Sequence, residues 1–187
     1  MYKIKIILLS LFFFSHTAFA DFKDEVVTKL QSINSLEFNF KQETEGEVEQ
    51  GKCFMQFPGK MKCIYQSEDG KEILVAKNQM YIIKKKFGRA YRYPIKNTQF
   101  SILLDKIELT KNINKIENYQ TSDSGVIFNI NTENGISVKI FFDKNSKILK
   151  GWETISINQT KSKFEIIEPT INTNFNEEFS VPSYGNF

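Results

Sequence analysis

The segment Leu36-Glu37-Phe38-Asn39-Phe40-Lys41-Gln42 indicates the fold class, because apolar and polar residues alternate along it without interruption. Side chains that follow one another along a strand point to opposite faces of the sheet. Leu36, Phe38 and Phe40 therefore share one face, and the polar residues between them share the other. An antiparallel sheet with one face on the core and one in water has this pattern. The sequence thus predicts a strand over residues 36–42 that covers a core with one side only.

The same alternation returns further along the chain, in short segments separated by turn residues. Its clearest instance is a hairpin in which residues 126–130 and 136–142 flank Asn134-Gly135, a pair that tight hairpin turns favour. Further strands are predicted over residues 72–76, 79–85, 90–93, 152–157 and 164–167, and Phe175, Phe179 and Val181 supply a last apolar anchor. The short connections predict a mainly β, antiparallel sheet of about ten to eleven strands, which should curl into an unclosed barrel.

Helices are predicted before the sheet and in its middle. Residues 22–33 carry apolar side chains at three- and four-residue spacing, which indicates an amphipathic helix. Asn97-Thr98 can cap a short helix that runs to Leu104. That helix is too apolar to be exposed, so it should form a lid on the sheet. Residues 105–120 fit a helix or a strand equally, and the acidic stretch 43–50 fits a loop or an exposed hairpin tip.

Cys53 and Cys63 flank Pro58-Gly59, a strong turn signal. If the loop centres on Pro58, the two cysteines face each other on adjacent strands of a hairpin, close enough for a disulfide. An oxidising compartment would favour that bond. A redox-active pair is disfavoured because the C-x-x-C spacing is absent. A metal site with two thiols and no histidine is less favoured still.

Residues 1–20 have the pattern of a secretory signal peptide. Lys3 and Lys5 precede an apolar run from Ile6 to Phe14, and the segment closes with Ala18-Phe19-Ala20. A membrane-spanning anchor needs about 20 apolar residues, and this run is much shorter. We therefore expect cleavage after Ala20, export to the periplasm, and one mature domain over residues 21–187. A lipid-modified N-terminus is not expected, because no cysteine follows the cut.

Removal of residues 1–20 also changes which functions the composition permits. The remaining chain has 23 Lys and Arg against 22 Asp and Glu, a net charge of +1, which gives no support to nucleic-acid binding. The only histidine, His16, lies in the signal segment. Histidine-based triads and histidine-ligated metals are therefore excluded from the mature chain. Carboxylate-, lysine- or tyrosine-based chemistry stays open, and a carboxylate-based hydrolase is one alternative function, but no motif indicates it. Neither an enzyme nor a cofactor is therefore expected.

One local basic cluster runs from Lys84-Lys85-Lys86 through Arg89 to Arg92. Such a cluster at a hairpin end is most simply a solvated surface. The more specific alternative is an electrostatic contact with anionic lipid or with a protein partner.

Several segments, taken in order, resemble the LolA family, whose members carry outer-membrane lipoproteins through the periplasm. The segments that carry the resemblance are Leu30 to Gln42, the Gly51–Tyr65 hairpin, Glu72 to Val75 with Gln79 to Tyr81, Asn97 to Phe100 with Leu103 and Leu104, Trp152, and Phe179-x-Val181-Pro182. The resemblance covers nearly all of the mature chain. It implies an incomplete antiparallel barrel whose helical lid closes over an apolar cavity.

The resemblance also implies a function and partners. A carrier of this family would take acylated lipoproteins from an inner-membrane ABC transporter and deliver them to an acceptor lipoprotein or to the outer membrane directly. It would act as a monomer and as a chaperone, with no nucleic acid, metal or cofactor. The alternative is a periplasmic lipid-binding or envelope-sensing domain of the same fold.

The family's barrel interior maps onto one face of the predicted strands and onto the lid. The residues expected to line the acyl-chain cavity are Leu30, Phe38, Phe40, Met55, Phe57, Met61, Leu74, Phe100, Leu103 and Leu104. Phe57 departs from the family pattern, which has an arginine just before the hairpin proline that is tied to lid closure. Either another group closes the lid here, or release is governed differently.

Overall fold

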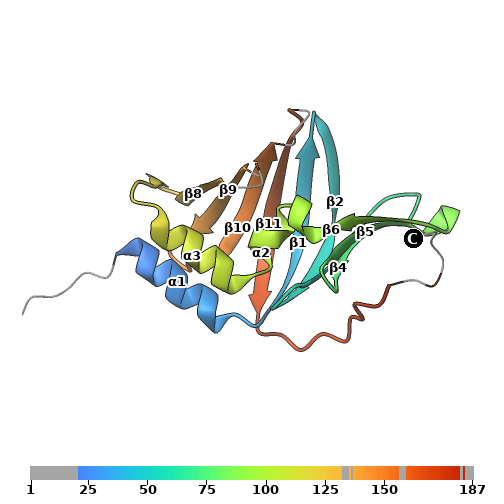
Figure 1. The fold of residues 1–187 in the computed structure, drawn as a ribbon, viewed down its shortest axis with the longest axis horizontal. Coiled ribbons are helices and arrows are strands. Elements are labelled where there is room, and N and C mark those ends of the chain that lie inside the picture. Colours follow the sequence, from blue (N-terminus) through green and yellow to red (C-terminus); the bar gives the residue numbers. More distant parts are fainter. Residues whose placement is uncertain (1–20, 132–134, 136, 156–158, 182, 184–187) are drawn as a thin grey trace, which may run out of the picture.

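The computed structural model describes residues 21–131, 135, 137–155, 159–181 and 183. Within these residues, eleven strands form one antiparallel sheet with the order β6-β5-β4-β3-β2-β1-β11-β10-β9-β8-β7 (Figure 1). The strands are β1 (Ser35–Thr44), β2 (Glu47–Gln56), β3 (Lys60–Tyr65), β4 (Lys71–Ala76), β5 (Gln79–Lys84), β6 (Arg89–Pro94), β7 (Gln120–Ser122), β8 (Gly125–Asn131), β9 (Ser137–Asp143), β10 (Leu149–Ile155) and β11 (Lys161–Ile171). The edge strands β6 and β7 do not pair with each other, so the predicted unclosed, mainly β fold is confirmed.

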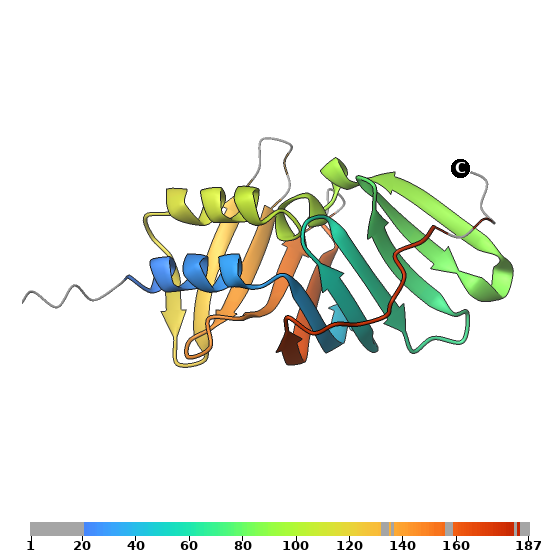
Figure 2. The ribbon, with the colours of Figure 1, turned by 90° about the horizontal axis from the view of Figure 1, so that it is seen from below.

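In the described part of the chain, three α-helices lie on the concave face of the curled sheet: α1 (Phe22–Ser32), α2 (Phe100–Leu103) and α3 (Lys106–Lys115). Helices α1 and α3 pack against each other over the β7–β10 side of the sheet (Figure 2). Strands β4–β6 extend beyond them as a wing, which carries the short 3₁₀ helices η1 (Lys85–Phe87) and η2 (Ile95–Asn97). Helix α2 lies over the middle of the sheet, where the Phe100 ring meets Trp152 of β10 (Figure 1).

The core is formed by the alternating apolar residues of the strands and by the buried faces of the helices. Phe38 and Phe40 of β1 point to the same side as Phe128 of β8, and all three are buried in one cluster. Leu109 and Ile113 of α3 enter this cluster from the helix layer. The two-residue period therefore identified the buried face of these strands correctly.

Two ambiguous segments are resolved by local hydrogen bonds. Residues 105–120 begin as helix α3, because the Asp105 carboxylate accepts hydrogen bonds from the backbone N–H groups of Ile107 at 2.9 Å and Glu108 at 3.1 Å. The acidic stretch 43–50 is an exposed hairpin tip, since β1 and β2 pair from Thr44 and Glu47 onward around Glu45-Gly46.

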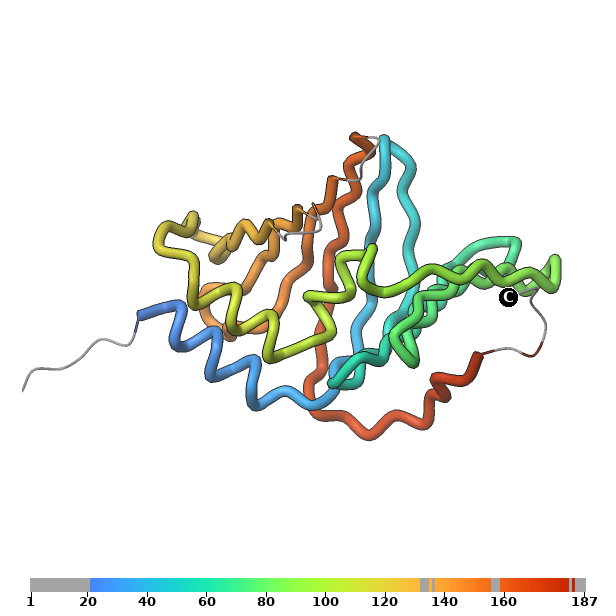
Figure 3. The backbone as a smooth tube through the Cα atoms, in the orientation of Figure 1, coloured from blue at the N-terminus to red at the C-terminus, as the bar shows by residue number. Residues whose placement is uncertain are grey.

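The C-terminal segment leaves β11 and crosses the sheet toward the wing (Figure 3). The Phe175 ring lies 5.4 Å from that of Phe54, and the Glu177 carboxylate lies 2.5 Å from Lys62 Nζ. Phe179 and Val181 pack against a second apolar cluster, formed by Leu74, Tyr81, Ile83 and Ala90. The predicted C-terminal apolar anchor is thus confirmed, on the face of the sheet opposite the helices. The predictions for residues 1–20, Asn134, Ile136, the end of the strand at Ile157, and Pro182 lie outside the described residues.

Candidate functional site

A cysteine-bridged hairpin forms part of the floor of the concave face. Strands β2 and β3 pair in the predicted register, with Cys53 opposite Cys63 and Met55 opposite Met61. A disulfide joins the two cysteines, as predicted. All four side chains are buried on the same face as Phe38 of the neighbouring strand. The bond therefore fixes the register of a surface made of sulfur-containing and aromatic side chains, which are soft and polarisable.

Helix α2 covers this floor with apolar side chains. Phe100, Ile102, Leu103 and Leu104 are each at most 4% exposed. The Phe100 ring meets Trp152 edge-on at 6.3 Å, and Trp152 stacks on Phe164 at 4.1 Å. The lid is thus closed, and its own side chains occupy the concave face.

Most of the residues predicted to line a cavity come together under this lid. Those that share one buried cluster are Leu30, Phe38, Phe40, Met55, Met61, Phe100, Leu103 and Leu104. Phe57 is partly buried and packs against the same cluster. Sequence spacing therefore located a single contiguous surface, built from α1, β1, the cysteine hairpin and the lid.

Leu74 does not belong to this surface, and the prediction that it faces the concave side was wrong. Leu74 pairs with Lys62, whereas Met61 pairs with Val75. Leu74 therefore lies on the outer face, in the cluster that the C-terminal segment covers. Val75 takes the inward position and is fully buried. The sequence could not distinguish the two, because Ile73 to Ala76 are apolar without interruption.

The turn of the cysteine hairpin is tied to both neighbouring helices. The backbone N–H of Phe57 donates to the Asn34 carbonyl, just after α1, at 3.0 Å. The N–H of Gly59 donates to the carbonyl of Leu104, at the end of the lid, also at 3.0 Å. Gly59 adopts a positive φ of 72°, which a residue without a Cβ tolerates best. The hairpin turn is therefore part of the closure of the lid.

A lysine that sequence reasoning missed completes this closure. Lys106 Nζ donates to the carbonyl oxygens of Ile33 at 3.0 Å and Gln31 at 3.3 Å, at the C-terminal end of α1. A cation is favourable at that end of a helix, where carbonyl groups lack partners. The same ammonium lies 5.5 Å from the centre of the Phe57 ring. Lys106 thus joins α1, α3 and the hairpin turn.

Beyond the lid, the concave face continues onto the wing as a partly open apolar strip. Met80 and Ile82 of β5 pair with Tyr93 and Tyr91 of β6 and share one face with them. Tyr91 is 43% exposed and Tyr93 is 42% exposed, while Met80 packs against the main core. We call these four residues the wing strip. It connects the buried cluster to solvent.

Two tyrosine phenols, those of Tyr65 and Tyr119, are each held by a hydrogen bond to a neighbouring side chain. Burial raises the pKa of the Tyr65 phenol, which donates to Gln42 Oε1 at 2.6 Å. A hydrogen bond to Asp21 raises the pKa of Tyr119 to about 12. Both phenols are therefore protonated and weak nucleophiles near neutral pH. Within the described residues, no group of three or more His, Cys, Asp or Glu side chains could hold a metal ion.

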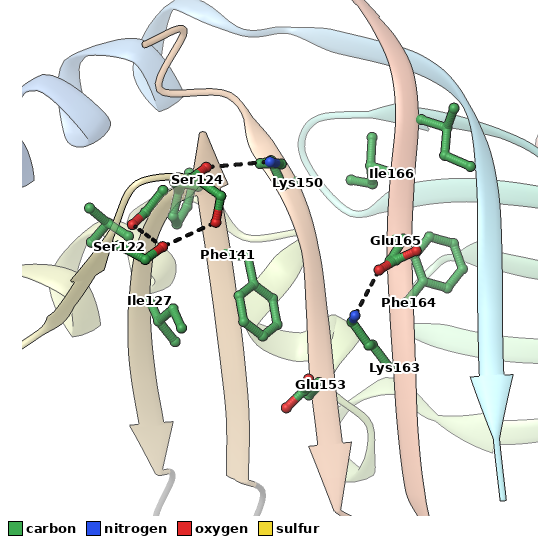
Figure 4. Close-up of a pocket in the computed structure, with 14 residues that line it drawn as sticks. Ser122, Ser124, Ile127, Phe141, Lys150, Glu153, Lys163, Phe164, Glu165 and Ile166 are labelled. Carbon is green, nitrogen blue, oxygen red and sulfur yellow. Dashed lines mark hydrogen bonds and ion pairs between the residues drawn. The ribbon is translucent and has the colours of Figure 1, made fainter. Parts of the chain in front are cut away.

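A separate shallow pocket of about 440 Å³ lies on the outer face of β8–β11 (Figure 4). Its rim includes Lys163 and Glu165, which form an ion pair at 2.7 Å. Their hydrogen bond raises the pKa of Lys163 and lowers that of Glu165. These two charges of β11 therefore satisfy each other, and Lys150 and Glu153 of β10 line the same pocket.

The family-model comparison matches residues 31–181 to "Outer membrane lipoprotein carrier protein LolA". The chain belongs to the LolA family. A relative from Francisella tularensis subsp. tularensis, named outer-membrane lipoprotein carrier protein, is 28% identical over 95% of this chain and 93% of its own length. The corresponding protein of F. tularensis subsp. novicida is 27% identical over the same shares.

Solved structures with a similar fold include a putative outer membrane lipoprotein-sorting protein domain from Vibrio parahaemolyticus. It is 10% identical, with a TM-score of 0.49 over 83% of this chain and 93% of that one. A LolA superfamily protein from Nitrosomonas europaea is 8% identical, with a TM-score of 0.44 over 85% and 97% of the two chains.

Membership of the LolA family gives the Phe57–Lys106 arrangement its significance. The position before the hairpin proline, where the family resemblance implies an arginine, holds Phe57. In this LolA-family chain a cation is still present at the closure, but α3 supplies it as Lys106. No helix among the described residues is long and apolar enough to cross a membrane.

Proposed function

We propose that this protein is a periplasmic chaperone that carries acylated lipoproteins and covers their acyl chains on the concave face of the sheet. The observation that carries the proposal is the apolar cluster between α2 and the floor of the sheet, which opens to solvent through the wing strip. Membership of the LolA family and the names of its relatives support the choice of cargo.

An acyl chain in water costs about 0.8 kcal/mol for each exposed CH₂ group, so a carrier has to cover most of its length. The lid side chains now fill the space that an acyl chain would need. Bound acyl chains would take the place of the lid side chains on the floor. The acyl chains would become buried while the lid side chains lose their burial, so apolar surface would be exchanged rather than newly buried. The net binding energy is therefore small compared with the gross burial, which permits release.

Helix α2 is suited to such an exchange because it has only four residues. A helix this short is held mainly by the burial of its side chains and has little stability of its own. The exposed tyrosines of the wing strip can meet an acyl chain while the lid is still closed. We therefore infer that the chain enters over the wing strip and then displaces the lid.

The same proposal covers the export of the protein, the loading of its cargo and the delivery of that cargo. Cleavage after Ala20 leaves residues 21–187 as one domain in the periplasm. This domain receives cargo from an inner-membrane ABC transporter and acts as a monomer, without enzymatic activity. It delivers the cargo to an acceptor lipoprotein or directly to the outer membrane.

The test adds purified residues 21–187 to spheroplasts and measures lipoprotein in the soluble fraction. We expect release in a complex with the carrier. A Tyr91→Ser/Tyr93→Ser variant should release less, because it removes apolar surface at the point of entry without disturbing the core. Ile107→Ser is the matched control, since Ile107 is 79% exposed on α3. Failure of the folded wild-type protein to release any lipoprotein would reject the carrier role.

A further inference from the structure

The hairpin between β5 and β6 ends in a tip, residues 84–89, at the far end of the wing (Figure 2). The tip contains η1 and turns back at Gly88, whose φ of 56° lies in the left-handed region. It lies at the edge of the sheet, because β6 is a terminal strand. This position leaves the tip free to meet a surface before the rest of the molecule does.

Phe87 is exposed at this tip, although a large aromatic side chain is costly in water. Its side chain is 56% exposed. Scattered exposed apolar residues are normal on protein surfaces. Phe87 differs because the exposed aromatic rings of Tyr91 and Tyr93 follow on the adjoining strand and cations flank it on both sides.

The tip belongs to a basic part of an otherwise slightly acidic chain. Residues 68–96 hold six Lys and two Arg against three acidic residues, a net charge of +5, whereas residues 21–187 together carry +1. The remainder of the mature chain is therefore net negative. This asymmetry gives the molecule an orientation in the field of a charged surface.

Only some of these cations are available for an external partner. Lys84 pairs with Asp69 at 3.0 Å, and Lys85 pairs at 2.5 Å with Glu72, whose side chain is buried. These two lysines anchor the tip to the sheet. Lys86 and Arg89 are exposed on either side of Phe87, and no ion pair of theirs is found within the described residues. Within the tip, they are the two cations that can face outward.

We propose that the β5–β6 tip docks this protein on an anionic phospholipid bilayer, with Phe87 inserted at the interface and Lys86 and Arg89 on lipid phosphates. Aromatic side chains favour the headgroup level of a bilayer, and basic residues are attracted to its negative surface. Docking in this way brings the wing strip to the membrane, because Tyr91 follows the tip on β6. This inference goes beyond lipoprotein carriage, since it concerns the empty protein.

The test measures co-sedimentation of residues 21–187, without cargo, with vesicles of phosphatidylcholine and phosphatidylglycerol or of phosphatidylcholine alone. We expect binding to the anionic vesicles only, and loss of that binding at high salt, which screens exposed charges. Phe87→Ser should weaken binding roughly tenfold, because the inserted ring is lost. Lys86→Gln/Arg89→Gln should also weaken it by about tenfold or more.

Matched variants separate the tip from general charge and hydrophobicity. Lys115→Gln/Lys144→Gln removes the same charge from exposed sites near the other end of the sheet, and Ile107→Ser removes an exposed apolar side chain from α3. Both controls should bind like the wild type. In a Phe87→Trp variant, brominated lipid should quench the new indole but not the buried Trp152.

Two results would overturn the proposal. One is that the folded wild-type protein does not bind anionic vesicles at low salt. The other is that the tip variants bind as tightly as the controls. Neither result depends on lipoprotein release from spheroplasts, so the docking proposal and the carrier proposal can fail separately.

Discussion

The Lys106 ammonium lies 5.5 Å from the centre of the Phe57 ring, so the first turn of α3 is joined to the cysteine hairpin. The same ammonium donates to the carbonyl of Ile33 at 3.0 Å. Because α3 follows the lid directly, this contact holds the C-terminal end of α2 against the floor.

Replacement of Lys106 should loosen the lid. A Lys106→Met variant keeps an apolar stem but loses the hydrogen bonds to α1 and the cation over Phe57. We expect it to lower the free energy of unfolding by about 1–2 kcal/mol. Hydrogen exchange at the Leu103 and Leu104 amides should become faster. Lys111→Met, at an exposed ion pair with Glu108, should leave both quantities nearly unchanged. Unaltered lid exchange in the Lys106 variant would show that this contact does not hold the lid.

Introduction of an arginine at Phe57 tests whether the cation on α3 takes the place of the missing one. Phe57→Arg alone sets a guanidinium beside the Lys106 ammonium, and we expect a loss of about 1 kcal/mol in unfolding free energy. Phe57→Arg/Lys106→Met removes that repulsion and should recover stability. The comparison is a double-mutant cycle measured by chemical denaturation. Additive effects of the two changes would mean that the residues are not coupled.

Loss of the Cys53–Cys63 disulfide should destabilise the protein moderately. The bridged residues are ten apart in sequence, so the chain-entropy model gives a loss of about 2–3 kcal/mol. Thermal unfolding with and without reductant measures the effect, and Cys53→Ala/Cys63→Ala should unfold at the same temperature in both conditions. The prediction would be contradicted if complete reduction left the unfolding temperature of the wild-type protein unchanged.

Detachment of the C-terminal segment should leave the concave face intact. Phe179→Ser removes an apolar side chain from the cluster around Leu74 and Tyr81. We expect faster proteolysis within residues 173–181 but unchanged exchange at the lid amides. Asn176→Ser, at an exposed position in the same segment, is the control. Faster exchange at the lid would show that the two faces of the sheet are coupled.

The Tyr119–Asp21 hydrogen bond should stabilise the folded protein up to about pH 10 and lose this effect at higher pH. The pKa of Tyr119 is raised from 10.0 to about 12 in the folded protein, chiefly because its hydroxyl donates to Asp21. The stabilisation is therefore complete below pH 10 and is lost as the pH rises toward 12. The hydrogen bond also lowers the pKa of Asp21, so its stabilisation is present above the ordinary carboxyl pKa and is lost in strong acid.

Ultraviolet absorbance of tyrosinate across this range checks the prediction. Because burial also raises the pKa of Tyr65, the comparison is made in a Tyr65→Phe background, where the phenol that titrates near pH 12 should be missing once Tyr119→Phe is added. If the Tyr119→Phe variant retains that late-titrating phenol, Tyr119 is not its source.

Local patterns in the sequence predicted those parts of the fold that depend on near neighbours. Alternation fixed the inward face of β1, and the turn at Pro58-Gly59 fixed the register that places Cys53 opposite Cys63. The helix α1 followed from its apolar spacing. These features need only the period of the side chains and the geometry of one turn, so a few consecutive residues contain the information.

Contacts between distant segments were decided by the tertiary structure alone. No local pattern indicates that β1 pairs with β11, which sets Leu36 opposite Ile171. The continuous apolar run around Leu74 has no alternation, so only pairing with Lys62 reveals its face. Nothing in the local sequence distinguishes Lys106 from other surface lysines, and only the packing of the helices places its ammonium at the end of α1. The sequence determined which surfaces are apolar, whereas packing determined which surfaces meet, because contact between remote segments depends on the whole folded chain.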